Sequence, residues 1–101
     1  MRISVILCTY NRCQILGRAL ESVAASKLPE SVTWEVIVVD NNSSDQTRQV
    51  TEDFCQRHPG RFRYVFERCP GKSFALNTGV RTSGGDILAF MDDDVVVQQM
   101  W

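Results

Sequence analysis

Three consecutive carboxylates, Asp92, Asp93 and Asp94, directly follow the apolar run of residues 87–91. Adjacent anions repel one another, and a hard divalent cation with oxygen ligands relieves that repulsion. A diphosphate would complete the coordination shell of such a cation. The triplet alone is equally typical of a solvated acidic turn that ends a strand. The choice between a metal site and a strand terminator therefore depends on the rest of the chain.

Two further polar segments follow apolar runs in the same way. Residues 9–12 follow the run 3–7, and residues 40–42 follow the run 34–39. In open parallel sheets, ligands bind at the carboxyl ends of the strands, where the strand order reverses. If these runs are parallel strands, one rim of the sheet bears all three polar segments. That coincidence indicates a binding site.

Strand-like and helix-like patterns alternate along the chain. Apolar runs predict strands over residues 3–7, 34–39 and 87–91, and alternating aromatic and polar residues predict a strand with one buried face over 62–66. Helical spacing with start and stop signals predicts helices over residues 12–26, 46–57 and 74–82. Ser and Asp side chains of the loop 41–45 are expected to cap the second helix, and the pair Gly84 and Gly85 to end the third by adopting positive φ. The order βαβαβαβ predicts the α/β class: a Rossmann-like, doubly wound parallel sheet in which each strand is buried on both faces, with the strand order 3-2-1-4.

The composition is that of one globular domain. The chain has 101 residues, of which 44% are hydrophobic and 23% charged, enough for a single core. A net charge of -1 predicts no general attraction to nucleic acid or to a membrane surface. Four cysteines without a CxxC pair argue against a zinc site and favour a reduced, cytoplasmic chain. We see no signal peptide and no run of membrane-spanning length, although a membrane anchor in a longer parent protein stays open.

Four segments, in this order, resemble the nucleotide-binding half of family 2 glycosyltransferases, the inverting GT-A-fold enzymes that use nucleotide sugars. They are SVILCTYNR at residues 4–12, EVIVVDNNSSD at 35–45, GKSFALNTG at 71–79 and GGDILAFMDDD at 84–94. The resemblance implies that residues 1–101 form a single nucleotide-sugar-binding domain, a truncated GT-A domain that lacks the acceptor half.

The same resemblance implies roles for rim residues. Asp40 resembles the aspartate that accepts a hydrogen bond from the imide N–H of a pyrimidine, a role suited to a group that only accepts. Thr9 and Tyr10 resemble residues that touch the base and ribose. The usual loop reads Asp-Asp-Gly-Ser where this chain reads Asp40-Asn41-Asn42-Ser43, which leaves the preferred base less defined. Arg12 is interpreted as a first-turn helix residue rather than a phosphate ligand.

The resemblance also assigns the acidic triplet to the DXD motif. Asp94 is the expected direct ligand of Mn²⁺ or Mg²⁺, Asp92 a second ligand or a ribose contact, and Asp93 an auxiliary residue. Lys72 is expected to steady the diphosphate or the base. The expected nucleotide-sugar-binding residues are Thr9, Tyr10, Asn11, Asp40, Asn42, Lys72, Asp92 and Asp93, and the expected metal ligands are Asp94 and Asp92.

The function implied is the donor-binding part of a metal-dependent inverting glycosyltransferase that uses a nucleotide diphosphate sugar, with a UDP-sugar favoured and the acceptor unknown. The general base is expected beyond Trp101, with Asp45 as the nearest exception, so the 101 residues alone should be inactive. They should also self-associate through residues 87–91 or 95–97. Two alternatives stay open: a non-catalytic nucleotide-sugar-binding module and, more remotely, a P-loop NTPase. The P-loop motif requires a glycine where this chain has Phe66.

Overall fold

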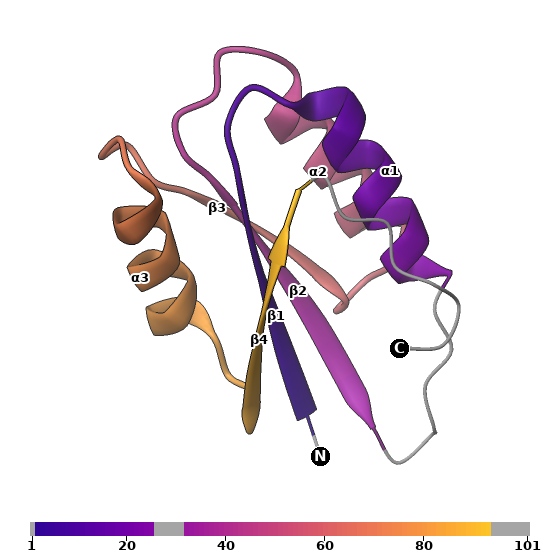
Figure 1. Cartoon of the computed structure of the whole chain (residues 1–101). Helices are drawn as coiled ribbons and strands as arrows, with labels where there is room; N and C mark the ends of the chain where they lie inside the picture. Colours follow the sequence, from indigo (N-terminus) through magenta and orange to yellow (C-terminus); the bar gives the residue numbers. More distant parts are fainter. Residues whose placement is uncertain (1, 26–31, 94–101) are drawn as a thin grey trace.

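The computed structural model describes residues 2–25 and 32–93, which form a parallel sheet with helices on both faces (Figure 1). The elements are β1 (Arg2–Thr9), α1 (Cys13–Ala24), β2 (Thr33–Asp40), α2 (Thr47–Arg57), β3 (Phe62–Phe66), α3 (Lys72–Thr82) and β4 (Ile87–Asp92). The strands run parallel in the order β3-β2-β1-β4. The predicted element order, fold class and strand order are therefore confirmed.

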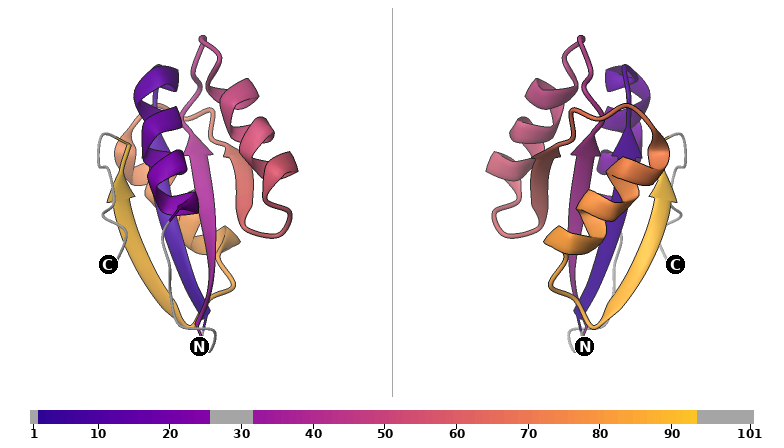
Figure 2. Two further views of the ribbon diagram at one scale, coloured as in Figure 1. Left: turned by 90° about the vertical axis from the view of Figure 1, so that its right-hand side faces the viewer. Right: turned by 90° about the vertical axis from the view of Figure 1, so that its left-hand side faces the viewer.

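Helices α1 and α2 cover one face of the sheet, and α3 covers the other (Figure 2). Because neighbouring residues of a strand point to opposite faces, β1 and β2 supply apolar side chains to both layers. The core under α1 and α2 includes Val5, Leu7, Leu16, Leu20, Val36 and Val38. The smaller core under α3 includes Ile6, Ile37, Val39 and Ala75. The two central strands are thus packed on both faces, and the polar residues at their carboxyl ends follow directly from these buried strands.

The two edge strands, β3 and β4, are exceptions to the prediction that each strand is buried on both faces, and β4 is the more exposed of the two. Ile87, Leu88 and Phe90 are 45%, 39% and 59% exposed. The reason is position: within the described residues β4 pairs only with β1, and α3 packs over β1 and β2 instead. Only Ala89 and Met91 of this strand pack against the core under α1 and α2. The apolar run of residues 87–91 therefore forms an edge strand and not a strand that is buried on both faces.

The turn from α3 into β4 differs from the prediction. Helix α3 ends at Thr82, and Ser83 is extended, with φ -67° and ψ 146°. Among the described residues the glycines with positive φ are Gly60 and Gly71, so the expectation for Gly84 and Gly85 was wrong. Gly85 is needed for close approach instead, because a Cβ atom there would lie 2.7 Å from the backbone nitrogen of Ser4.

Helices α1 and α2 share one capping carboxylate, Asp45. Its side chain accepts hydrogen bonds from the backbone N–H groups of Cys13 (3.1 Å) and Thr47 (3.0 Å), the first residues of the two helices. An Asp of the preceding loop thus binds the first N–H of α2, as expected, although the N-cap residue itself is Gln46, whose side chain makes no capping bond. None of the helices in residues 2–25 and 32–93 has the length and apolarity needed to cross a bilayer.

Candidate functional site

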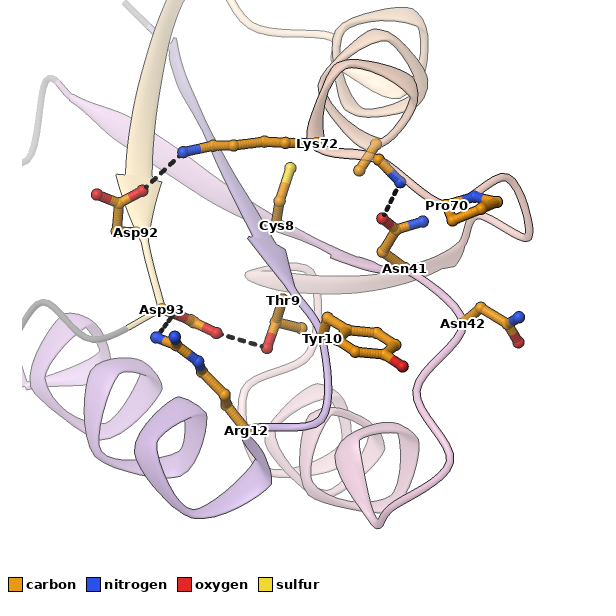
Figure 3. Close-up of a pocket in the computed structure, with 12 residues that line it drawn as sticks. Cys8, Thr9, Tyr10, Arg12, Asn41, Asn42, Pro70, Lys72, Asp92 and Asp93 are labelled. Carbon is orange, nitrogen blue, oxygen red and sulfur yellow. Dashed lines mark hydrogen bonds and ion pairs between the residues drawn. The ribbon is translucent and has the colours of Figure 1, made fainter.

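A cavity of about 730 Å³ opens at the carboxyl ends of the strands, between the loops that follow β1, β2 and β3 and the end of β4 (Figure 3). It lies where the fold predicts, because the chain leaves β1 towards α1 on one face and reaches β4 from α3 on the other. The lining residues are Cys8, Thr9, Tyr10, Arg12, Asn41, Asn42, Pro70, Gly71, Lys72, Ala75, Asp92 and Asp93.

Most of the residues predicted to bind a nucleotide sugar meet in this cavity. They are Thr9, Tyr10, Asn42, Lys72, Asp92 and Asp93. Asn11 and Asp40 do not line it, and the predicted metal ligand Asp94 lies outside the described residues. Sequence reasoning left Arg12 and Asn41 out of the site, and both line the cavity.

Asp93 is a buried carboxylate of the cavity wall that two side chains hold in place. It is 7% exposed, accepts a hydrogen bond from Thr9 Oγ1 at 2.9 Å, and its other oxygen lies 3.4 Å from Arg12 Nη1. These contacts fasten the end of β4 to the end of β1. Arg12 therefore points into the cavity region, where its guanidinium adds positive charge. Its partner lies 81 positions along the chain, so a helix-start pattern could not reveal this contact.

A second ion pair crosses the cavity from α3 to β4. Lys72 Nζ lies 3.2 Å from Asp92 Oδ1, and the two side chains are 68% and 65% exposed. Ion pairs in water at this level of exposure contribute little to stability. Lys72 also sits at a helix N-terminus, where a cation is unfavourably placed against the helix dipole. Both groups are therefore free to exchange partners with a ligand.

Asp40 lies behind the cavity rather than in its wall. It is 2% exposed, and its two oxygens accept hydrogen bonds from Ser43 N (2.9 Å) and Tyr64 Oη (2.6 Å). Burial, followed by this hydrogen bond, raises the pKa of Tyr64 well above its ordinary value, so Tyr64 keeps the proton that it donates. A carboxylate offers about four acceptor positions. Asp40 thus retains acceptor capacity beyond its two internal partners.

Asn11 joins the two loops that flank the cavity on the α1 and α2 side. It adopts a left-handed conformation (φ 50°). Its backbone N–H donates to Ser43 Oγ (2.8 Å), and its side-chain oxygen accepts from Ser44 N (2.7 Å). The structure therefore places Asn11 as a brace between loops.

Asp45 has the wrong properties for a general base. Although burial opposes the shift, hydrogen bonds from Thr47 and Cys13 lower the pKa of Asp45 below its ordinary value. A general base works best with a pKa near the operating pH. Its bonds to two helix N-termini give Asp45 a structural task.

The described carboxylates partly fit a divalent cation. Within residues 2–25 and 32–93 there is no group of three His, Cys, Asp or Glu side chains arranged to hold a metal. Asp92 nevertheless presents an exposed oxygen donor on the cavity wall. Mg²⁺ usually takes one or two carboxylates and completes its shell with phosphate oxygens and water. The donor chemistry at the cavity therefore suits a hard divalent ion that arrives with a diphosphate.

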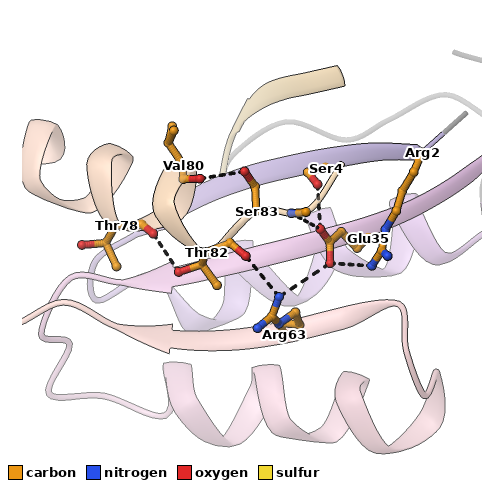
Figure 4. A network of polar contacts seen from close by, with 9 residues as sticks. Arg2, Ser4, Glu35, Arg63, Thr78, Val80, Thr82 and Ser83 are labelled. Carbon is orange, nitrogen blue, oxygen red and sulfur yellow. Dashed lines mark hydrogen bonds and ion pairs between the residues drawn. The ribbon is translucent and has the colours of Figure 1, made fainter. Parts of the chain in front are cut away.

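A second polar cluster lies at the opposite end of the sheet, around Glu35 (Figure 4). Glu35 is 1% exposed and accepts hydrogen bonds from Ser4 Oγ (2.6 Å), Gly84 N (3.1 Å) and Arg2 Nη2 (3.0 Å). Although burial opposes the shift, these donors, with Arg63, lower the pKa of Glu35. Each charge here has a protein partner, so this cluster holds the α3–β4 turn onto the sheet and offers nothing to a ligand.

Comparison with known proteins gives a consistent match along nearly the whole chain. A model of the family described as Glycosyl transferase family 2 matches residues 4–101. Glycosyltransferase AglE of Haloferax volcanii is 34% identical over 99 residues, which is 98% of this chain and 32% of that protein.

Two solved structures superimpose closely on the chain. The mannosyltransferase PcManGT from Pyrobaculum calidifontis, in complex with GDP-Man and Mn²⁺, gives a TM-score of 0.82 at 32% identity over 91% of this chain and 27% of that one. S. aureus TarS 1-349 in complex with UDP-GlcNAc gives 0.82 at 30% identity over 98% of this chain and 28% of that one. The chain spans 32% or less of the length of these relatives.

Proposed function

Since this chain belongs to glycosyl transferase family 2, we propose that it forms the donor-binding part of an inverting glycosyltransferase that moves a sugar from a nucleotide diphosphate sugar to an acceptor hydroxyl. The observation that supports this proposal is the cavity at the carboxyl ends of the strands, which brings two cations and two carboxylates together. Its volume of about 730 Å³ is in the range typical of small-molecule sites.

Different residues of the cavity are proposed to contact different parts of the donor. Lys72 and Arg12 offer positive charge to the diphosphate, as phosphate oxygens require. Tyr10, 58% exposed, offers a ring face for the base, and Asn42 is an exposed polar group beside it. Asp40 is proposed to accept the N–H of the base with the acceptor positions that Ser43 and Tyr64 leave free.

A divalent ion, Mn²⁺ or Mg²⁺, is part of the proposal, with Asp92 and Asp94 as its protein ligands. When bound, such an ion stabilises the negative charge that develops on a departing nucleoside diphosphate. Lys72, whose ammonium already lies beside Asp92, holds positive charge at the same wall of the cavity. The relative PcManGT was crystallised with both GDP-Man and Mn²⁺.

We favour a UDP-sugar as the donor, as in the complex of TarS with UDP-GlcNAc, although the relative PcManGT is in complex with GDP-Man. The 101 residues alone should not turn over substrate. In residues 2–25 and 32–93, Asp93 is bound to Thr9 and Arg12, and Asp45 to two helix N-termini. Neither is free to take a proton from an acceptor hydroxyl.

The proposal is tested by following the amide resonances of the chain while UDP, UMP and uridine are added separately. UDP should shift the amides of Thr9, Asn42 and Lys72 and bind more tightly than UMP, because the cavity provides two cations for the second phosphate. Equal affinity for uridine and UDP, or shifts confined to the Glu35 end of the sheet, would refute the proposed site. An assay of sugar transfer would then separate an enzyme from a non-catalytic binding module.

A further inference from the structure

The loop of residues 67–71 connects β3 to α3 and forms one wall of the cavity through Pro70 and Gly71. The side chain of Asn41, from the neighbouring loop after β2, makes three hydrogen bonds to this segment. Its Nδ2 donates to the carbonyl oxygens of Glu67 (3.1 Å) and Cys69 (2.7 Å). Its Oδ1 accepts from the backbone N–H of Gly71 at 3.0 Å, as Figure 3 shows.

These bonds use both N–H groups of the Asn41 amide. Asn41 lines the cavity, but both of its donors are used within the protein, and phosphate oxygens need donors, so an effect of Asn41 on phosphate binding passes through the loop. An aspartate could still accept from Gly71. Its second carboxylate oxygen would, however, replace the amino group of Asn41 and would repel the carbonyl oxygens of Glu67 and Cys69.

The hydrogen bond between Gly71 and Asn41 lies directly before the start of α3. Its φ of 125° is a conformation that residues with a side chain rarely adopt, and α3 begins at the next residue, Lys72. The ammonium of Lys72 then reaches Asp92 across the cavity. The position of the Gly71 peptide, held by Asn41, therefore sets where the Lys72 side chain starts.

We infer that Asn41 is a positioning residue of the nucleotide diphosphate site: it holds the loop 67–71 so that Lys72 faces the phosphates of the ligand. This inference rests on the proposed function. It predicts an effect on the loop in the absence of ligand and an effect on UDP affinity, and the two are measured separately.

The ligand-free test is tryptic cleavage of the native chain at Arg68, which is exposed within the loop. Asn41→Leu, which keeps the size but removes the three hydrogen bonds, and Asn41→Asp, which removes the two donors, should each speed this cleavage by about 10-fold through local opening. Asn77→Asp, the same substitution as Asn41→Asp on an exposed position of α3, should leave the rate unchanged. If cleavage at Arg68 is not faster, or rises only in step with cleavage at Arg18 and Arg48 in the other helices, the inference is wrong.

The test with ligand is a double-mutant cycle for UDP affinity. Asn41→Leu and Lys72→Met should each weaken UDP binding by about 10-fold, and the double variant by less than about 20-fold, because both changes remove the same contact. A loss near 100-fold, the product of the two single effects, would overturn the inference. If the unmodified chain does not bind UDP, the proposed function fails, and the cleavage rates still decide whether Asn41 holds the loop.

Discussion

The ammonium of Lys72, at the first residue of α3, lies 3.2 Å from the carboxylate of Asp92, at the last residue of β4. The pair joins two elements that flank the cavity and that are 20 residues apart in the chain. Since both groups are exposed, a bound diphosphate can attract the ammonium without leaving a buried charge unpaired. This arrangement leads to the first prediction.

Lys72→Met should weaken UDP binding by about 10-fold, because the variant loses a charge-assisted contact to phosphate. Arg81→Met removes one positive charge from the last turn of the same helix and should change the affinity by less than about 2-fold, since that charge is screened by solvent. Calorimetric titration of the two variants gives both values. Equal losses would show that only net charge matters and that Lys72 has no specific position.

Thr9→Val should lower the free energy of unfolding by about 1 to 2 kcal/mol, because it removes a hydrogen-bond donor from the buried carboxylate of Asp93. The matched control is Thr33→Val at the exposed start of β2, which should change stability by less than about 0.5 kcal/mol. Urea unfolding followed by circular dichroism measures both. An unchanged midpoint for Thr9→Val would contradict the role given to this bond.

Glu35→Gln should destabilise the chain by about 1 to 3 kcal/mol at neutral pH, because the amide cannot accept from Ser4, Gly84 and Arg2 as the carboxylate does. Glu52→Gln removes a carboxylate from an exposed i,i+4 pair on α2 and should cost less than about 1 kcal/mol. Chemical unfolding of the two variants makes the comparison.

The pH dependence of stability follows from the same residue. The pKa of Glu35 is lowered in the folded chain, so the native state binds fewer protons than the unfolded state in acid. The stabilisation is present above the ordinary carboxyl pKa of about 4.3 and is lost as the pH falls through the lowered value. As the pH is lowered from neutral, the free energy of unfolding should fall less steeply in Glu35→Gln than in the unmodified chain. An identical slope would show that other carboxylates cause the acid loss.

Self-association of the 101 residues is expected through β4, which exposes Ile87, Leu88 and Phe90 on an edge strand. Phe90→Lys should shift the chain towards monomer in sedimentation at tens of micromolar. Phe66→Lys makes the same change at a 51% exposed position of the opposite edge strand, β3, and should not. A monomeric unmodified chain, or equal effects of the two variants, would contradict this expectation.

The elements of the fold were predictable because each has a local signal. The apolar runs and helical spacings located all seven elements, and β3 was predicted with the same bounds as observed, Phe62–Phe66. The ends of the other elements differ from the prediction by at most two residues, and pairing extends β1, β2 and β4 beyond their apolar runs. The edge position of β4 was contained in the predicted strand order 3-2-1-4, whereas the prediction that every strand is buried on both faces was wrong for this strand.

The site was predictable to the extent that its residues follow strands. Thr9, Asp92 and Asp93 were found in this way. Arg12 and Asn41 were missed because their partners lie in other loops, at Asp93 and at residues 67–71. Asp40 was expected at the cavity, but the sequence contains no sign of the hydrogen bond from Tyr64 that holds it behind the wall.

The most direct test of the donor-site proposal is the linkage between UDP and Mn²⁺, measured by calorimetry on the unmodified chain. If Asp92 and Asp94 hold an ion that also binds the diphosphate, Mn²⁺ must raise the affinity for UDP by the same factor by which UDP raises the affinity for Mn²⁺. We predict that both factors exceed about 5, the lower range of measured couplings. Equal UDP affinity in Mn²⁺ and in excess chelator would instead show that the acidic triplet only ends a strand.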